Sequence, residues 1–216
     1  MPNGTNKTPV RNVFVINGGA PHAFAGGELN AMLSEVACAA ITQAGATYEV
    51  TRAFEPFDPE VEVQRFLRAD LIVYQMPAWW MGTPWPMKRY MDEVFTAGYG
   101  RLYAHDGRTP DDPAGRYGSG GLLTGRRYLI SATWNAPESA FSDPAGLFEG
   151  RGIEALYFPF HKANQMLGLT PFPTFVFADV IKDPKVARDV RRYRSYLETI
   201  LAGRANPGFD PEDGIA

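Results

Sequence analysis

Short apolar runs alternate with segments of helical periodicity along most of the chain. The apolar runs have the length and the β-branched or aromatic content of buried strands, and the segments between them repeat their apolar residues with the helical period. The predicted strands are 12–16, 47–52, 71–74, 127–133 and 173–178. The predicted helices are 29–41, 59–69, 87–95, 158–167 and a last helix that opens at Asp183-Pro184 and ends at Gly203. This alternation predicts an α/β protein whose parallel sheet has helices on both faces.

Five parallel strands suit the flavodoxin-like, doubly wound order 2-1-3-4-5. In this order the first and third strands are neighbours at the point where the winding changes direction, and open sheets of this kind bind ligands there. We therefore expect the loops that follow strands 12–16, 71–74 and 127–133 to face one another.

The loop after the first strand, Asn17 to Gly27, is rich in glycine and leads directly into a helix. Backbone N–H groups and the helix dipole favour a phosphate at such a place. The dinucleotide fingerprint GxGxxG and the P-loop pattern are both absent from this loop. The indication is therefore moderate, because glycines after a strand are often only turn residues.

The loop after the third strand carries Trp79, Trp80 and Met81, with Trp85 close behind. Such side chains are costly in water, so they are covered either by a flat apolar ligand or by a neighbouring loop or subunit. The loop after 127–133 is also aromatic, with Trp134-Asn135-Ala136-Pro137. One loop with N–H groups for phosphate and two with aromatic and polar groups for a ring suit a flavin nucleotide.

The composition and charge of the chain argue against several kinds of binding partner and site. The chain has 216 residues, 45% hydrophobic, and a formal net charge of −3, which gives no electrostatic footprint for nucleic acid or anionic membrane. The single cysteine, Cys38, excludes an intrachain disulfide, and three widely spaced histidines indicate no metal site. We expect a disordered arm at 1–9, one domain at 10–203, a loose tail at 204–216, and a cytoplasmic location.

Several long motifs are more specific than these patterns: QMPAWWMGTPWPMKRYMDEVF from Gln75, DGRT from Asp106, RYGSGG from Arg116, TWNAP from Thr133 and PFHKANQMLG from Pro159. With them the chain resembles the modulator of drug activity B family of FAD-dependent NADPH:quinone reductases, relatives of DT-diaphorase. The resemblance implies tightly bound FAD and a homodimer with the flavin near the subunit interface. It also implies ping-pong, two-electron reduction of quinones by NADPH.

The resemblance implies no metal site. It also implies a set of residues that contact the cofactor. They are Phe24, Ala25, Gly26, Gly27, Glu28, Leu29, Asn30, Pro77, Ala78, Trp79, Trp80, Met81, Tyr117, Thr133, Trp134, Asn135 and Ala136. Tyr117 is in addition a candidate contact for the quinone. Trp79, Trp80 and Trp134 are expected to wall the flavin ring, and the N–H groups near Asn135 and Ala136 to stabilise negative charge on it.

Two departures from the family pattern matter. Phe24-Ala25 replaces the usual His-Ser pair, so the N–H groups of Ala25, Gly26 and Gly27, or His22, would have to hold the phosphate. The Tyr-His pair of DT-diaphorase has no counterpart, since Phe141 stands at about the tyrosine position and no histidine follows within Ser142 to Arg151. We therefore assign no catalytic residue.

Two other functions stay open from the sequence. The first is a flavodoxin-type carrier that passes single electrons to a protein partner. The tryptophans and the small net charge speak against it, because a carrier needs an acidic, shallow rim for docking. The second is a member of the family that has kept the fold and lost the flavin.

Overall fold

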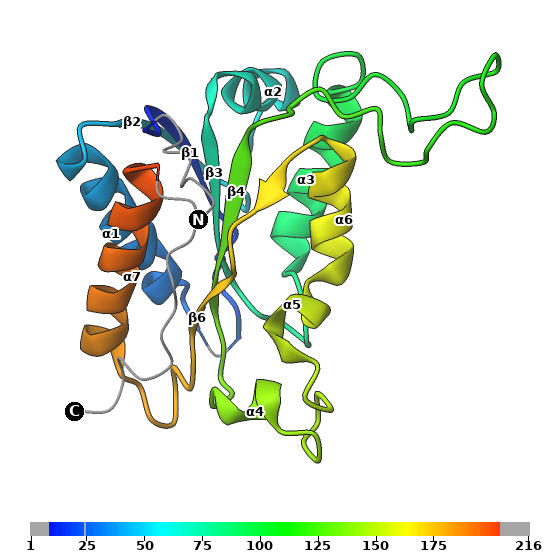
Figure 1. Ribbon diagram of the computed structural model, residues 1–216. Helices are drawn as coiled ribbons and strands as arrows, with labels where there is room; N and C mark the ends of the chain where they lie inside the picture. The colour runs from blue at the N-terminus through cyan, green and yellow to red at the C-terminus, as the bar shows by residue number, and fades with distance from the viewer. Residues whose placement is uncertain (1–8, 24, 204–216) are drawn as a thin grey trace, which may run out of the picture.

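A parallel sheet with helices on both faces forms the centre of the computed structural model, which describes residues 9–23 and 25–203 (Figure 1). The strands are β1 (Asn12–Asn17), β2 (Thr47–Arg52), β3 (Leu71–Pro77), β4 (Arg127–Thr133), β5 (Thr170–Pro171) and β6 (Phe175–Phe177). The helices are α1 (Glu28–Gln43), α2 (Pro59–Arg68), α3 (Trp85–Ala97), α4 (Ser139–Ser142), α5 (Gly152–Leu156), α6 (Phe158–Met166) and α7 (Val186–Leu201). The expected terminal arm and tail lie, except for Pro9, outside the described residues.

The strand order is β2-β1-β3-β4-β5, with β6 also paired to β4, and every pairing is parallel. This confirms the predicted order. In the register, Gln75 of β3 lies between Asn17 of β1 and Ser131 of β4. The carboxyl ends of β1, β3 and β4 therefore lie at the same end of the sheet.

The predicted fifth strand at 173–178 is wrong in one respect, because two short strands, β5 and β6, share the edge of β4. Pro171 and Pro173 have no N–H to donate to a ladder, which limits a continuous strand here. Between them the N–H of Phe172 still bonds to the carbonyl of Tyr128, at 2.7 Å. The chain then rejoins β4 at Phe175.

The two faces of the sheet bury separate hydrophobic clusters. Helices α1 and α7 cover one face with residues such as Leu33 and Leu197, and α2, α3 and α6 cover the other with residues such as Phe66 and Met91 (Figure 1). Residues alternate between the faces along each strand, as the pleat requires.

Most helix boundaries follow local signals. Helix α2 begins after Asp58, whose carboxylate accepts a hydrogen bond from the N–H of Glu60 at 2.9 Å. The last helix begins at Val186 and not at Asp183-Pro184, because the N–H of Asp183 closes a turn onto Asp179. The short helices α4 and α5 were not predicted, since four or five residues show no period.

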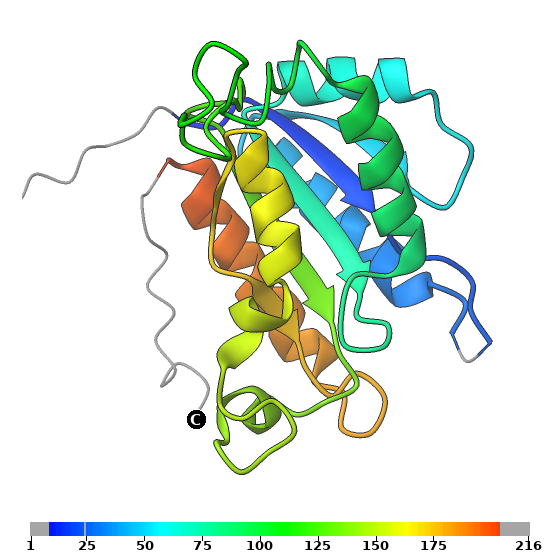
Figure 2. The same cartoon turned by 90° about the vertical axis from the view of Figure 1, so that its right-hand side faces the viewer.

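The long connection at 98–125 packs at the amino end of β4. Leu122 and Leu123 donate N–H bonds to the carbonyls of Leu102 and Leu167. Gly121 lies so close to the backbone of Gly168 that a Cβ would come within 2.2 Å of its nitrogen. The tip of this connection projects from the end of the sheet opposite the loops that follow β1 and β3 (Figures 1 and 2).

Candidate functional site

Three loops meet at the carboxyl ends of β1, β3 and β4: the first loop (residues 18–27), the tryptophan loop (78–84) and the β4 loop (134–138). Figure 2 shows the three strands running toward the same end, where the first loop and the tryptophan loop project. The N–H of Gly18 donates to the carbonyl of Gln75 at 2.8 Å, and the N–H of Ala78 donates to the carbonyl of Thr133 at 2.9 Å. The expectation that these loops lie together is confirmed.

A buried polar network lies beneath the three loops. The side chain of Asn30, in the first turn of α1, accepts a hydrogen bond from Nε2 of Gln75 at 2.9 Å and donates one to Oγ1 of Thr133 at 3.2 Å. Asn30 and Thr133 are each 5% exposed, and Gln75 is fully buried. The amide of Asn30 and the hydroxyl of Thr133 thus face inward, and their hydrogen bonds serve the protein itself.

The first loop closes on itself between His22 and Ala25, whose backbones exchange hydrogen bonds of 2.7 and 3.0 Å. This corrects the expectation for Ala25, because its N–H is already used and cannot also bind phosphate. The N–H groups of Gly26 and Gly27 bond to no other described residue. Phe24 lies outside the described residues.

Glu28 occupies the place where an anion would bind. A Cβ added to Gly26 would lie only 2.1 Å from Oε1 of Glu28, so the carboxylate rests against that glycine. The positive end of a helix dipole stabilises a carboxylate there as it would a phosphate. Glu28 therefore competes with an incoming phosphate, although the resemblance counted it among the cofactor contacts. Leu29, which follows it, is half-buried.

The tryptophan loop is a tight turn in which Trp79 and Gly82 exchange backbone hydrogen bonds of 3.1 and 3.3 Å. The turn places Trp80 and Met81 at its tip with φ values of 45° and 66°, which are unfavourable for residues with a Cβ. Trp80 is 94% exposed. Strained backbone carrying an exposed indole is typical of ligand sites. Pro77 and Ala78 lead into the turn and are half-buried.

The β4 loop corrects a second expectation. The indole of Trp134 is 5% exposed and packs against Phe141 and Phe148, while its Nε1 donates to the hydroxyl of Tyr157 at 3.2 Å. It therefore cannot wall a ring at the surface. The alternation along β4 carried this signal, because Trp134 continues the face of Tyr128, Ile130 and Ala132.

The backbone of the β4 loop is held by the segment between β6 and α7. The N–H of Asp179 donates to the carbonyl of Ala136 at 2.9 Å, and the N–H of Val180 donates to that of Trp134 at 3.1 Å. No described residue accepts a hydrogen bond from the N–H of Asn135 or of Ala136. Among the residues that the structure describes, these two N–H groups at the carboxyl end of β4 thus have no acceptor.

Tyr117 is not brought to these residues within one chain. It belongs to the connection at 98–125, which lies at the opposite end of the sheet (Figure 2), and its side chain is 69% exposed. The direction taken by a connection of this length cannot be read from its sequence, whereas its motif was recognisable.

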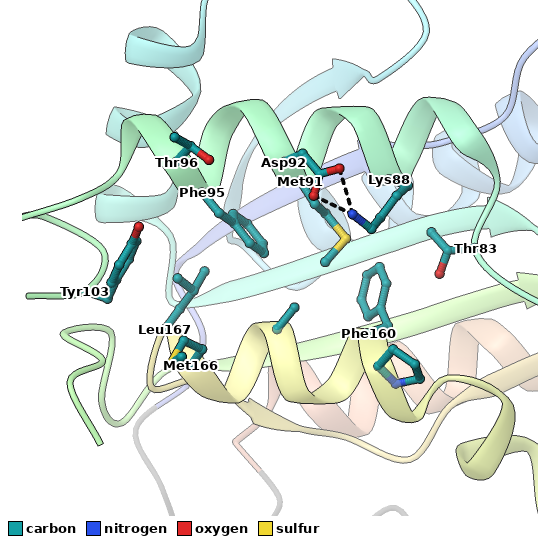
Figure 3. Close-up of a pocket in the computed structure, with 12 residues that line it drawn as sticks. Thr83, Lys88, Met91, Asp92, Phe95, Thr96, Tyr103, Phe160, Met166 and Leu167 are labelled. Carbon is teal, nitrogen blue, oxygen red and sulfur yellow. Dashed lines mark hydrogen bonds and ion pairs between the residues drawn. The ribbon is translucent and has the colours of Figure 1, made fainter. Parts of the chain in front are cut away.

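A groove of about 550 Å³ runs between α3 and α6 (Figure 3). Its lining is mainly apolar, and the ion pair of Lys88 with Asp92, at 2.5 Å, lies along one side. Thr83 of the tryptophan loop lies at one end, so the groove adjoins the candidate site. The helical period of 87–95 predicted the apolar face of α3, but not that α6 would leave it partly uncovered.

A second polar cluster lies on the α6 side of the sheet. The hydroxyl of Tyr128 lies 2.6 Å from Nδ1 of His161, and Nε2 of His161 lies 2.8 Å from Glu154. Glu154 also accepts hydrogen bonds from the N–H and hydroxyl of Thr174. Burial raises the pKa of Glu154, but the bonds from His161 and Thr174 outweigh it, so the net pKa is lowered. This cluster ties α5 and α6 to the sheet.

Similarity to known proteins identifies the family of this chain. A family model described as a flavodoxin-like fold matches residues 15–199. The NADPH:quinone oxidoreductase MdaB of Haemophilus influenzae is 42% identical over 190 residues, which are 88% of this chain and 99% of MdaB. The chain belongs to this flavodoxin-like family, together with MdaB.

The chain is also similar to an uncharacterized protein and to solved structures. An uncharacterized protein of Schizosaccharomyces pombe is 50% identical over 194 residues, 90% of this chain and 98% of its own. Among solved structures, general stress protein 14 of Treponema denticola in complex with FMN has a TM-score of 0.63 at 19% identity, covering 88% of this chain and 99% of its own. At 19% sequence identity this structural similarity shows only that the two proteins share a fold.

Among residues 9–23 and 25–203, no three His, Cys, Asp or Glu side chains gather where they could hold a metal ion. The helices within these ranges are all too short or too polar to cross a bilayer.

Proposed function

We propose that the protein is an NAD(P)H:quinone oxidoreductase that uses bound FAD. The observation that carries the proposal is a set of N–H groups that have no acceptor among the described residues and lie around an exposed indole. Gly26 and Gly27 offer donors on the loop after β1, and Asn135 and Ala136 offer donors after β4. Trp80 projects from the loop between them, after β3. The 42% identity to MdaB supports the same activity.

Each loop has a separate task in this proposal. The N–H groups of Gly26 and Gly27 at the start of α1 hold phosphate, because helix N-termini bind anions. Trp80 and Met81 cover one face of the flavin ring and exclude water from it. The N–H groups of Asn135 and Ala136 stabilise negative charge on the ring, as fixed donors do for any developing anion. The flavin itself supplies the hydride chemistry between nicotinamide and quinone.

The choice of FAD over FMN rests on the resemblance to the FAD-dependent family. The structural neighbour from Treponema denticola was solved with FMN, so the identity of the flavin is the first point to test. NADPH as the donor and a cytoplasmic location are part of the same proposal.

A homodimer would explain the position of Tyr117. Within one chain the connection that carries it lies at the end of the sheet opposite the tryptophan loop (Figure 2). In a twofold dimer the exposed tip of one subunit's long connection would reach the site of the other. Tyr117 would then contact flavin or quinone across the interface.

The test begins with protein purified without added cofactor. Its visible spectrum is recorded, and the flavin released by heat is identified by mass spectrometry. Bound FAD, bleached by NADPH and reoxidised by a quinone, would establish the proposed activity. Bound FMN that accepts single electrons and does not react with quinones would favour the electron carrier. Protein that neither contains nor takes up flavin would overturn the proposal.

A further inference from the structure

Gln75 interrupts the apolar sequence of β3 with a fully buried amide at the end of the strand that leads into the tryptophan loop. Its carbonyl oxygen accepts the N–H of Gly18 at 2.8 Å. Its side-chain Nε2 donates to Oδ1 of Asn30 at 2.9 Å. The same residue therefore holds the first loop at both ends, at the exit from β1 and in the first turn of α1.

Asn30 extends this connection to the other two loops. Its Nδ2 donates to Oγ1 of Thr133 at 3.2 Å, and the carbonyl of Thr133 accepts the N–H of Ala78 at 2.9 Å. The packing is tight as well, since a Cβ on Gly19 would lie 2.8 Å from Cβ of Asn30. A shift of Asn30 would thus be transmitted to the first loop, the β4 loop and the tryptophan loop.

The stretch 23–27 of the first loop depends on the position of its backbone to hold a phosphate. Between Ala23 and Gly27 no side chain is charged or carries a hydroxyl group. Only the N–H groups of this stretch can then hold a phosphate, and the N–H of Ala25 is already bonded to His22. Because hydrogen bonds weaken steeply as they are misaligned, binding by N–H groups requires that the ends of the loop be fixed.

The amide of Gln75 is poorly explained by stability alone. Its Oε1 is buried without a hydrogen-bond partner among the described residues. An unsatisfied buried acceptor destabilises a fold, whereas an apolar side chain at this position would avoid that cost. A buried polar group of this kind calls for another explanation.

We propose that Gln75 is a positioning residue, which acts through Asn30 to hold the phosphate-binding N–H groups of Gly26 and Gly27 in place. It does not touch the flavin itself. This inference rests on the proposed function, since it concerns how tightly the chain holds a flavin.

The test compares Gln75→Met with a matched control, Asn164→Leu. Both substitutions replace a fully buried amide by an apolar side chain of similar size. Asn164 lies on the opposite face, where it accepts from the hydroxyl of Tyr74 and donates to the carbonyl of Phe160. Asn164→Leu should melt at a lower temperature than the wild type, because it leaves the hydroxyl of Tyr74 without its acceptor. Gln75→Met should change the melting temperature less, because it also removes an unpaired buried acceptor. Only Gln75→Met should bind FAD more weakly, by about three- to tenfold, the range expected for one lost hydrogen bond.

Affinity is measured by quenching of flavin fluorescence, with added FAD and separately with FMN, far below the melting temperature of every variant. If Gln75→Met does not fold, Thr133→Val breaks the same network with a side chain of the same shape and should weaken FAD binding similarly. The double variant Gln75→Met/Asn30→Leu should bind no more weakly than Asn30→Leu alone, because the effect of Gln75 passes through Asn30.

Two results would overturn the inference in different ways. If the wild type binds flavin and Gln75→Met binds it equally well, Gln75 is not a positioning residue for the flavin site. If Gln75→Met and Asn30→Leu weaken flavin binding additively in the double variant, Gln75 does not act through Asn30. A wild type that binds neither flavin would remove the proposed function, and this inference with it.

Discussion

His22 and Trp79 are in ring contact across the crevice between the first loop and the tryptophan loop, with centroids 4.6 Å apart and planes inclined by 43°. The contact joins two loops that are far apart in the sequence. It also orients the turn that carries Trp80.

His22→Ala should weaken FAD binding, since the lost ring contact would free both loops. Aromatic pairs contribute about 0.5–1.5 kcal/mol, which corresponds to about two- to tenfold in affinity. The measurement is a fluorescence titration with FAD. Tyr48→Ala is the control, because Tyr48 is an exposed aromatic residue near the amino end of β2, away from both loops, and its loss should leave the affinity unchanged. Equal effects of the two substitutions would contradict the prediction.

Glu28→Gln should strengthen flavin binding. The substitution removes a carboxylate that rests against Gly26 at the start of α1, where the phosphate would bind. A charge near a helix N-terminus contributes about 0.3–1 kcal/mol, so we expect a gain of about two- to fivefold in affinity at low salt. The gain should shrink as salt is added. Weaker binding by Glu28→Gln would show that the carboxylate assists the cofactor.

Trp80→Gly should separate stability from binding. The φ of 45° at Trp80 is unfavourable for any residue with a Cβ, so glycine relieves strain of the order of 1 kcal/mol. The free energy of unfolding of the apoprotein should therefore stay equal or rise, while FAD affinity falls. Trp85→Ala is the control, since Trp85 packs near Phe54, with centroids 6.5 Å apart, outside the tip of the turn. An unchanged FAD affinity in Trp80→Gly would refute a role for this indole at the ring.

Gly19→Ala should be damaging and Gly82→Ala nearly neutral. A Cβ at Gly19 would lie 2.8 Å from Cβ of Asn30, whereas a Cβ at Gly82 would meet nothing within 4 Å. We expect Gly19→Ala to lower the free energy of unfolding by about 1–3 kcal/mol, as overpacking does, and to weaken flavin binding as Asn30 is displaced. Chemical denaturation and flavin titration of both variants check this, and a neutral Gly19→Ala would count against the tight packing.

Glu154 should make stability depend on pH at the acid side. Its pKa is lowered in the folded protein by His161 and Thr174, although burial opposes this. The stability it contributes is complete above its pKa in the unfolded chain, about 4.3, and is lost as the pH falls through the lower folded value. Because the side chain is half exposed, we expect a contribution of about 1 kcal/mol or less.

Thermal unfolding over a series of pH values tests this for Glu154→Gln. The variant should melt below the wild type at neutral pH, by about 2–4 °C for each kcal/mol lost, and the gap should close in acid. Glu149→Gln is the control, since it removes only an exposed pair with Arg151. A gap that stays constant as the pH falls would mean that titration of Glu154 is not linked to folding.

Much of the sheet could be predicted because period and composition act locally. The β-branched runs marked the strands, and the alternation of strands with helices implied their order. The split of the last strand was missed because the effect of Pro171 and Pro173 depends on which neighbour they face.

The sequence located the loops of the candidate site. It was less able to show the positions of their individual side chains and N–H groups. Position after a parallel strand located all three loops. The sequence could not show that the N–H of Ala25 is used within the loop, since that depends on its fold. Gln75 was missed as part of the network, although a polar residue in a buried strand was a usable signal. The position of Tyr117 required the path of a long connection.

The division of the predicted last strand into β5 and β6 also affects how readily the protein aggregates. A continuous strand at the edge of a sheet presents unpaired backbone groups that can recruit another strand. On the β5–β6 side, Pro171 and Pro173 remove donors and the edge is broken into two short pieces. The β2 edge is unbroken over six residues, and Tyr48 and Val50 are exposed along it. When the protein is heated or concentrated, we therefore expect aggregation through β2.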